Sequence, residues 1–341
     1  MPRTYNNLWD TICAFDNLYE AYLKAREGHR QNGEVIIFSR RLIDNLCYLQ
    51  HKLRNQTWMP STPKVFTIYE PKQRTIEATR FSDRVVHHAV MRVIDPLFRK
   101  KYISHTYACL PGRGFHYAAA QAQKYMRRRE ITYVLKCDIS SYFPTVDHAS
   151  AKRIVRRTIR DPKALWFLDT MLDSHGDIGM GIGALTSQSF AGYLLNTLDH
   201  YIKDDLGIKR YVRYMDDFLI FSSSKSELWD LKDQVSEFLG ETLQQRLNPK
   251  SGVFPVSQGV DFCGYRIYAH YLLPRKRNIK RARKRFYKLA RLYEQGAVTL
   301  DDIRASVEAF RGYVKHCRAW RTTDSAYEYG KIVRAPMKKG V

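Results

Sequence analysis

The chain has 341 residues, with 57 Lys and Arg against 34 Asp and Glu, so its formal net charge is +23. Because 44% of the residues are hydrophobic, this is a folded basic protein with a polyanionic partner and not a disordered basic tail. The length allows roughly two or three lobes, and the absence of an apolar run of about 18 residues excludes a membrane-spanning helix.

The N-terminal part of the chain predicts amphipathic helices. An apolar stripe with spacings of three to four residues is formed by Leu8, Ile12, Phe15 and Tyr19. A Pro-containing breaker at 57–63 ends this region, and residues 65–69 then alternate as a strand that turns at 70–73. The next helix carries one apolar stripe, made by Val86, Ala89, Val90, Val93, Ile94 and Leu97.

Two predicted strands in the middle of the chain end at acidic residues. Residues 131–137 form a mostly buried strand that ends at Asp138, and Asp147 is the expected N-cap of the following helix. Residues 209–222 form a strand, a tight turn and a second strand, with Asp216 and Asp217 at the tip.

The C-terminal part is strongly basic. After a hairpin predicted over 262–273, ten of the seventeen residues 275–291 are Lys or Arg and none is acidic. A later helix packs through Ile303, Val307, Phe310 and Val314. We expect sequence-independent contacts with nucleic acid phosphates from the following residues of these helices: Arg277, Lys280, Arg281, Lys284, Arg311 and Lys315.

The adjacent carboxylates predict a cation site. Asp216 and Asp217 repel each other on a turn, and a bound divalent ion would relieve that repulsion. A lone Asp-Asp pair is most often a solvated turn, but Asp138, at the end of a separate strand, would complete a site for two metal ions if the strands are neighbours.

The six cysteines lie far apart and show no zinc-ligand spacing, so we expect reduced thiols. The N-terminal residues 1–5 show no signal-peptide core. We therefore expect a cytoplasmic protein without membrane contact.

Several motifs occur in one order along the chain. They are Pro71-Lys72-Gln73-Arg74, Leu110-Pro111-Gly112-Arg113-Gly114, Asp138 to Phe143, Ile182 to Gln188, Tyr214-Met215-Asp216-Asp217, Asn248-Pro249-Lys250 and Phe262-Cys263-Gly264-Tyr265. In these motifs the chain resembles the reverse transcriptases. The resemblance implies an α+β, right-hand polymerase fold with N-terminal helices and fingers at 1–130, a palm at 131–273 (150–180 partly with the fingers) and a helical thumb at 274–341.

The resemblance also implies roles for single residues. Asp138, Asp216 and Asp217 would be catalytic and bind two Mg²⁺ ions, with Mn²⁺ as a substitute, and the backbone of Ile139 would assist. Phe143 would lie beneath the sugar and exclude a ribose 2′-hydroxyl. The remaining nucleotide contacts implied are Lys72, Arg74, Ile182, Gly183, Gln188 and Lys250. The remaining nucleic acid contacts implied are Arg113, Tyr214, Met215, Gly264 and Tyr265.

The stretch 181–188 indicates which group of reverse transcriptases the chain resembles. Most reverse transcriptases carry glutamine and proline where this chain has Ile182 and Gln188, and this replacement resembles the enzymes of diversity-generating retroelements. Gly181 departs from the proline more frequent in that group. The resemblance implies error-prone cDNA made chiefly at template adenines, in the cytoplasm of a bacterium, an archaeon or a phage host.

This resemblance also implies the partners of the enzyme. They are a structured template RNA, the cDNA/RNA duplex, deoxynucleoside triphosphates (dNTPs) and a small, basic, oligomeric accessory protein. Arginines at 127–129 and 156–157 could hold structured RNA or a protein. Two alternatives stay open: a retron, antiphage-defence or group II intron-like reverse transcriptase, and a catalytically silent RNA-binding scaffold.

Overall fold

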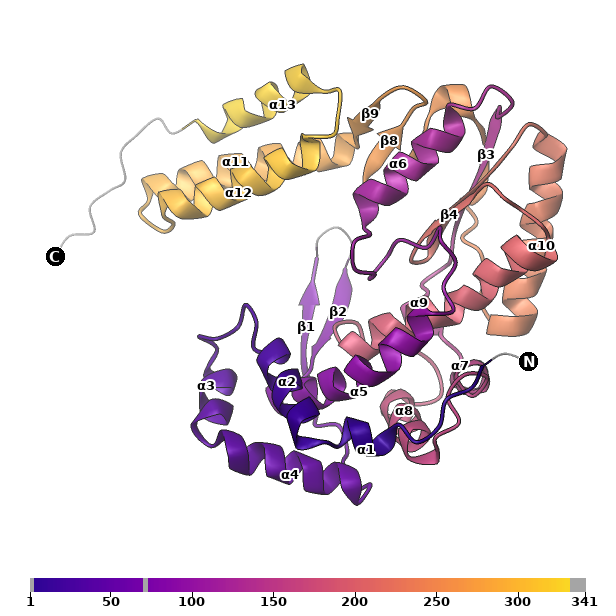
Figure 1. Ribbon diagram of the computed structural model, residues 1–341. Coiled ribbons are helices and arrows are strands. Elements are labelled where there is room, and N and C mark those ends of the chain that lie inside the picture. The colour runs from indigo at the N-terminus through magenta and orange to yellow at the C-terminus, as the bar shows by residue number, and fades with distance from the viewer. Residues whose placement is uncertain (1–2, 70–72, 332–341) are drawn as a thin grey trace.

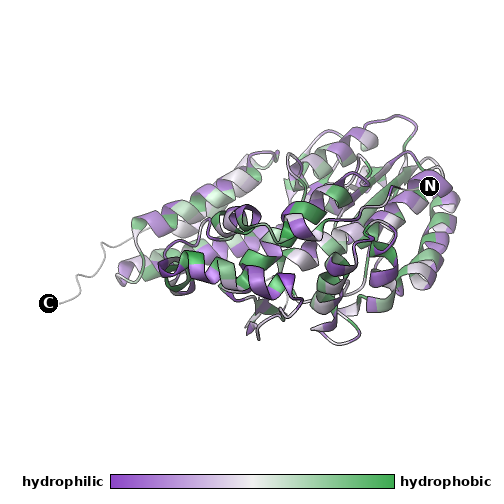
Figure 2. Cartoon of the chain, turned by 60° about the horizontal axis from the view of Figure 1, so that its bottom comes forward, coloured by the Kyte–Doolittle hydropathy of each residue, from purple (hydrophilic) through white to green (hydrophobic). Residues whose placement is uncertain are grey.

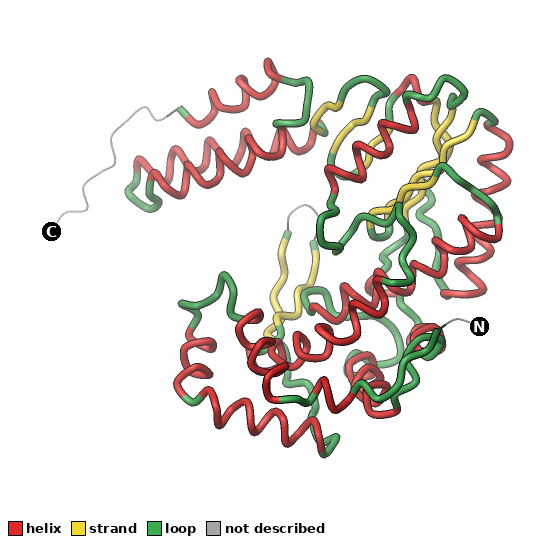
Figure 3. The backbone as a smooth tube through the Cα atoms, viewed as in Figure 1, coloured by secondary structure: helices red, strands yellow, loops and turns green. Residues whose placement is uncertain are grey.

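The computed structural model describes residues 3–69 and 73–331 (Figure 1). Its strands form three antiparallel sheets of two, four and three strands, with helices around them (Figure 3). In these two ranges no helix combines the length and the apolar character that crossing a bilayer requires. The arrangement belongs to the predicted α+β class.

The N-terminal helices gather around one long helix. They are α1 (Trp9–Ile12), α2 (Phe15–Ala25), α3 (Gly33–Arg40), α4 (Leu42–Arg54) and the long α5 (Phe81–Arg99). On α5 the predicted stripe is buried at Val86, Ala89, Val90 and Ile94. Tyr19 is exposed instead, because the chain breaks between α1 and α2 and the helical phase counted from Leu8 does not continue.

A two-stranded hairpin separates α4 from α5. It consists of β1 (Lys64–Ile68) and β2 (Arg74–Ala78), as the alternation over 65–69 predicted. The side chains of β1 are mostly exposed, so the hairpin extends from the body of the protein as an arm.

The central sheet has the order β4-β5-β3-β6. Its strands are β3 (Tyr133–Asp138), β4 (Tyr211–Tyr214), β5 (Asp217–Ser222) and β6 (Gly252–Pro255). Alternate residues of β3 enter different cores, with Leu135 packed with residues of α9 (Leu185–His200) and α10 (Lys225–Leu243), and Val134 packed with α6 (Phe115–Met126). The sheet is thus buried on both faces, which explains the nearly continuous apolar runs of its strands.

Short helices connect β3 to α9. They are the 3₁₀ helix η1 (Phe143–Thr145), α7 (His148–Val155) and α8 (Pro162–Asp173), and the π-helical turn η2 (Tyr201–Asp205) follows α9. The Asp147 carboxylate accepts a hydrogen bond of 2.7 Å from the backbone N–H of Ser150. The predicted N-cap of α7 is confirmed.

The C-terminal region departs from the single predicted hairpin. It forms a three-stranded sheet of β7 (Val260–Phe262), β8 (Tyr265–Ile267) and β9 (Leu272–Pro274), after the 3₁₀ helix η3 (Val256–Gln258). The helices that follow are α11 (Lys276–Glu294), α12 (Leu300–Val314), α13 (Trp320–Tyr327) and the 3₁₀ turn η4 (Glu328–Gly330). These helices extend away from the central sheet (Figure 1) and bury a core of their own around Phe286 and Phe310.

Amphipathic character accounts for most of this packing. Figure 2 shows helices that carry hydrophilic and hydrophobic stretches side by side, as expected for helices that bury one face. In α11 the apolar residues that enter the core are Ile279, Ala282, Phe286 and Ala290, whereas the cations lie on the rest of its surface. The basic face predicted from sequence therefore remains open to solvent.

Candidate active site

Three carboxylates meet at one edge of the central sheet. Strands β3 and β5 are antiparallel neighbours, and their register places Asp138 opposite Asp217. Asp216 occupies the turn between β4 and β5, and its carbonyl accepts a hydrogen bond of 3.2 Å from the backbone N–H of Ile139. The preceding residue, Met215, has φ of +54°, a conformation that side chains rarely adopt and that often marks a functional site.

The electrostatics of this edge favour a cation. Burial raises the pKa of Asp217 to about 7, and the charges of Asp138 and Asp216 add to the increase while Lys136 opposes it. Burial and the charge of Asp138 also raise the pKa of Asp216. One oxygen of Asp217, Oδ1, is buried without a hydrogen-bond partner among residues 3–69 and 73–331. A metal ion beside it would supply the missing partner and stabilise the ionised carboxylates.

The carboxylates fit an open metal site and not a closed cage. Asp138 Oδ2 accepts a hydrogen bond of 3.0 Å from Asn248 Nδ2, and Lys136 Nζ lies 3.7 Å from Asp217 Oδ2. Within residues 3–69 and 73–331, no three His, Cys, Asp or Glu side chains are grouped to hold a metal by themselves. Magnesium needs no such cage, because it is commonly held by one or two carboxylates together with substrate phosphates and water.

The predicted triphosphate contacts lie on the β1–β2 hairpin. Arg74 is exposed at the start of β2, and its charge lowers the pKa of Asp216, so the hairpin brings a cation within electrostatic reach of the carboxylates. Lys72 lies outside the described residues. Arginine at this place suits phosphate oxygens, because its planar guanidinium can donate two parallel hydrogen bonds.

Phe143 lies in η1, five residues after Asp138. Its ring is half-buried against Tyr142, with ring centroids 5.9 Å apart, and its carbonyl accepts a hydrogen bond of 2.9 Å from the N–H of Met180. Tyr142 is itself anchored, because its hydroxyl donates to the carbonyl of Ala191 at 2.9 Å. The ring of Phe143 is therefore supported by the anchored ring of Tyr142.

The loop that contains Ile182 is tied to the same hairpin. The backbone N–H of Glu77 on β2 donates to the carbonyl of Ile182 at 3.0 Å, and the Glu77 carboxylate lies 2.9 Å from His175 Nε2. A side chain at Gly181 would meet both partners of that pair at about 2.5 Å. Glycine at 181 thus makes room for the Glu77–His175 contact.

The other residues predicted for the nucleotide are Gly183 in this loop, Gln188 in the helix that follows it, and Lys250 before β6. Gly183 has φ of +131°, and a Cβ there would meet the Glu77 carbonyl at 2.9 Å, so glycine is required. Gln188 is exposed in the first turn of α9, and Lys250 is exposed after Asn248.

Tyr265 and Gly264 lie at the turn between β7 and β8. The structure buries Tyr265 fully, stacked on Tyr313 at 5.1 Å, and its hydroxyl donates to the Tyr313 carbonyl at 2.9 Å. The carbonyl of Gly264 accepts hydrogen bonds from Tyr313 and Asn278. These two residues join the β7–β8 turn to α11 and α12, and their predicted contact with nucleic acid stays a prediction.

Arg113 is also engaged in the structure of the protein. Its Nη1 donates to the carbonyls of Ile103, Ser104 and Thr106 at 3.3, 3.0 and 2.7 Å. The guanidinium therefore fastens a loop next to β4, whereas Tyr214 is half-buried on the strand itself.

The predicted phosphate contacts of the C-terminal helices are largely open to solvent. Arg277, Lys280 and Lys284 are exposed on α11, and Arg281 is half-buried. On α12 and just after it, Arg311 and Lys315 are exposed, and Arg311 pairs with Glu308 at 3.6 Å.

Sequence reasoning missed some residues that shape the carboxylate edge. Lys136 neutralises part of its charge, and Asn248 orients Asp138. Lys136 had a detectable signal, because residues two apart in a strand share a face and it precedes Asp138 by two. The ion pair between Arg213 and Asp199 could not be predicted from the sequence. Asp199 lies on α9, and nothing local to β4 predicts that neighbour.

The fold and the sequence were compared with those of known proteins. The Escherichia coli (strain K12) protein YkfC is 25% identical over 276 aligned positions, covering 67% of this chain and 72% of YkfC. The structure of apo telomerase from Candida tropicalis, truncated from its C-terminal domain, matches with a TM-score of 0.50 and 13% identity over 62% of this chain. The chain spans about half (54%) of that telomerase chain, and this likeness shows a shared right-hand polymerase fold.

A further structural match and a family match complete the comparison. Telomerase from Candida albicans, in complex with a TWJ fragment of telomeric RNA, matches with a TM-score of 0.48 and 13% identity, covering 81% of this chain and 61% of that one. Residues 70–267 match the family described as reverse transcriptase (RNA-dependent DNA polymerase). Because that match covers more than half of the chain and contains the carboxylate edge, the protein belongs to the reverse transcriptase family and is an RNA-directed DNA polymerase.

Proposed function

We propose that this polymerase makes error-prone cDNA for a diversity-generating retroelement, with errors concentrated at template adenines. The observation that carries the proposal is the stretch 181–188, where Ile182 and Gln188 replace the glutamine and proline of most reverse transcriptases. The anchoring of the Ile182 carbonyl by Glu77 supports it, since a loop held against the hairpin that bears Arg74 is well placed to contact a nucleotide.

Enzymes of this family use divalent metal ions. In our proposal Asp138, Asp216 and Asp217 hold two Mg²⁺ ions, for which Mn²⁺ can substitute, and the backbone of Ile139 assists. Such ions, when bound, stabilise the attacking and leaving oxygens of an in-line displacement. The chain contributes the placement, because the register of β3 and β5 brings acids 79 positions apart to the same point.

The protein groups around the metal site orient the nucleotide. Lys72 and Arg74 bind the triphosphate, and the supported ring of Phe143 lies beneath the sugar and excludes a 2′-hydroxyl. Gly183, Gln188 and Lys250 line the remaining surface of the nucleotide.

Loss of one hydrogen bond accounts for low fidelity. The apolar side chain of Ile182 cannot donate the hydrogen bond that glutamine would offer the incoming nucleotide. One net hydrogen bond contributes about 0.5–1.5 kcal/mol, which corresponds to a change of up to about tenfold in selectivity. The variant Ile182→Gln should therefore lower misincorporation opposite template adenine by several-fold, and an unchanged error rate would contradict the role of Ile182.

The decisive experiment copies a defined RNA template with Mg²⁺ and sequences the products. Synthesis that is absent in an Asp216→Ala/Asp217→Ala control, with errors clustered at template adenines, is the expected result. Accurate products would favour a retron, antiphage-defence or group II intron-like enzyme. Synthesis that stays absent after the native RNA and an accessory protein are added would favour an RNA-binding scaffold.

In this proposal the C-terminal helices α11 and α12 hold the nucleic acid. We assign fingers to 1–130, palm to 131–273 and thumb to 274–341, which is supported by the separate core around Phe286. The exposed cations of α11 and α12 contact the phosphates of the cDNA/RNA duplex, and Arg113, Tyr214, Met215 and Gly264 position its end. A small, basic, oligomeric accessory protein and a cytoplasmic location complete the proposal.

A further inference from the structure

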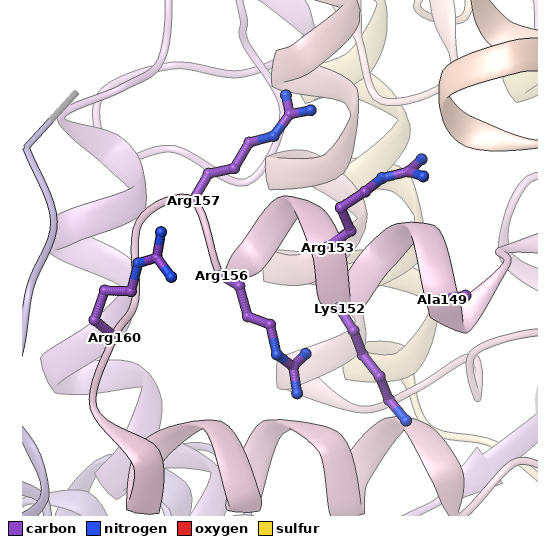
Figure 4. A pocket seen from close by; sticks show the side chains of 6 residues that line it. All are labelled: Ala149, Lys152, Arg153, Arg156, Arg157 and Arg160. Carbon is purple, nitrogen blue, oxygen red and sulfur yellow. The ribbon is translucent and has the colours of Figure 1, made fainter. Parts of the chain in front are cut away.

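A basic hollow lies on the outer surface of the palm, at α7. It has a volume of about 580 Å³ and is lined by Ala149, Lys152, Arg153, Arg156, Arg157 and Arg160 (Figure 4). Figure 1 shows α7 and the thumb helix α11 at opposite ends of the molecule. A ligand in this hollow would therefore not compete with a duplex held by the thumb.

The positive charge of the hollow is only partly neutralised by the protein. Lys152 pairs with Asp173 at 2.5 Å and Arg156 pairs with Asp169 at 2.5 Å, so these two cations reach toward α8 (Figure 4). Arg153 donates to the Thr242 carbonyl at 3.0 Å, which uses donors but adds no negative charge.

Two guanidinium groups are left available. Arg157 and Arg160 are exposed, and within the described ranges neither side chain makes a hydrogen bond or an ion pair. The surface continues past Arg160, because its backbone N–H bonds the Tyr5 carbonyl at 2.8 Å, and Arg3 and Lys100 both lie against the Tyr5 ring. The hollow thus opens into a wider basic surface.

The lining determines what kind of polyanion fits. Sites for single-stranded nucleic acid usually offer aromatic rings on which bases stack, and no lining residue of this hollow is aromatic. Arginine-rich walls without stacking groups suit the phosphates of a double helix, which are recognised by shape and charge. The small side chain of Ala149 keeps the floor open.

We infer that this hollow docks the phosphate backbone of a double-stranded segment of the template RNA, far from the nucleotides being copied. Arg157 and Arg160 make the principal phosphate contacts, and Arg153 flanks them. The inference rests on the RNA-directed activity of the enzyme and is independent of whether its products diversify a gene. Docking a folded part of the RNA here would select the proper template among other RNAs.

The test measures binding of a blunt RNA hairpin, which offers no end for copying, to the full chain. For Arg157→Glu/Arg160→Glu we expect the dissociation constant to rise at least about tenfold and the salt dependence to lose a slope of about 2. Extension of a short, unstructured primed template should be unchanged. The matched control Arg40→Glu/Arg41→Glu changes the net charge equally at exposed positions of the N-terminal helices.

Several outcomes would overturn the inference. Equal loss of hairpin affinity in both double variants would show only a general effect of net charge. Displacement of the hairpin by a glutamate-rich peptide of equal charge would assign the hollow to an acidic protein. If the glutamate variant fails to fold, Arg157→Gln/Arg160→Gln replaces it, and unchanged hairpin affinity in that folded variant would likewise overturn the inference.

Discussion

One acidic group, Asp199, packs against the β4–β5 hairpin, and another, the half-buried Asp217, begins β5, and the protein satisfies these two carboxylates differently. Asp199 on α9 is fully buried, and Arg213 of β4 donates to both of its oxygens at 2.6 and 2.5 Å. Tyr211 and Thr106 donate two further hydrogen bonds of 2.7 Å to the same carboxylate. Asp217, in contrast, has a raised pKa and one buried oxygen that finds no hydrogen-bond partner in the described part of the chain.

The difference shows which charge serves the fold and which serves the chemistry. Burial lowers the pKa of Arg213, but the stronger combined influence of Asp199 raises it overall, so the buried pair stays ionised. Arg213 also donates to the Met215 carbonyl at 3.1 Å, next to the acids. The Asp199–Arg213 pair, here called the closed pair, therefore holds the turn that carries Asp216 and Asp217, the open acids. The open acids remain available to bind ligands that the protein does not supply.

Removing the charges of Asp216 and Asp217 should have the largest effect of all. That effect should be on catalysis and not on stability. The variant Asp216→Asn/Asp217→Asn should lose synthesis by on the order of 10³-fold or more, because metal-ion stabilisation contributes several kcal/mol to the transition state. Its stability should not fall, since two half-buried charges that repel each other have been removed. Primer extension and thermal unfolding measure the two quantities, and a clearly lower unfolding temperature would contradict the assignment of these acids to chemistry.

Breaking the closed pair should act on stability first. The variant Arg213→Met leaves Asp199 buried without its counter-charge and should lower the free energy of unfolding by about 3–5 kcal/mol. The double variant Asp199→Asn/Arg213→Met should recover part of that loss, because no charge is then stranded. Urea unfolding of the three proteins measures this, and a loss below about 1 kcal/mol in the single variant would show that the pair is not structural.

The pH dependence of stability should also separate the two groups. A folded pKa of about 7 for Asp217 against an ordinary value of 3.8 means that the folded state binds more protons between these values. Stability of the metal-free protein should therefore fall as pH rises, by about 2–3 kcal/mol between roughly pH 5 and 8, relative to Asp217→Asn.

Metal titration supplies the control for that measurement. Mg²⁺ at pH 8 should raise the unfolding temperature of the wild type and leave that of Asp217→Asn nearly unchanged, because binding to the folded state alone stabilises it. Equal pH profiles for the two proteins without metal would refute the raised pKa.

The half-exposed Glu77–His175 pair is neither fully buried, as Asp199–Arg213 is, nor one of the open acids. Breaking it should give the smallest effect. His175→Ala should lower stability by about 1 kcal/mol or less, as expected for one partly exposed side-chain hydrogen bond. It should raise the KM for dNTPs by about two- to tenfold with little change in kcat, because the loop of Ile182 loses one support. Steady-state kinetics measure both, with Asp177→Ala at an exposed position of the same loop as the control, and equal effects of the two variants would argue against a positioning role.

Local patterns in the sequence predicted much of this architecture. The apolar run before Asp138, the Tyr-Met-Asp-Asp turn and the N-cap Asp147 all lie where they were expected, because strand period, turn chemistry and capping are properties of neighbouring residues. The order of the motifs was sufficient to predict the polymerase fold. Two local predictions were wrong: Tyr19 is exposed, since a two-residue break altered the helical phase, and the hairpin expected over 262–273 is a three-stranded sheet.

Only the tertiary structure decided which distant residues meet. The placement of Asp138 opposite Asp217 depends on which strands pair and in what register, and the bond between Arg213 and Asp199 joins β4 to a helix. The burial of Tyr265 depends on how β8 packs against Tyr313 of α12. Local periodicity predicts whether a side chain is buried or exposed. Its partners depend on how elements far apart in the chain pack together. That packing pairs Asp199 with Arg213 and leaves Asp217 open to a ligand.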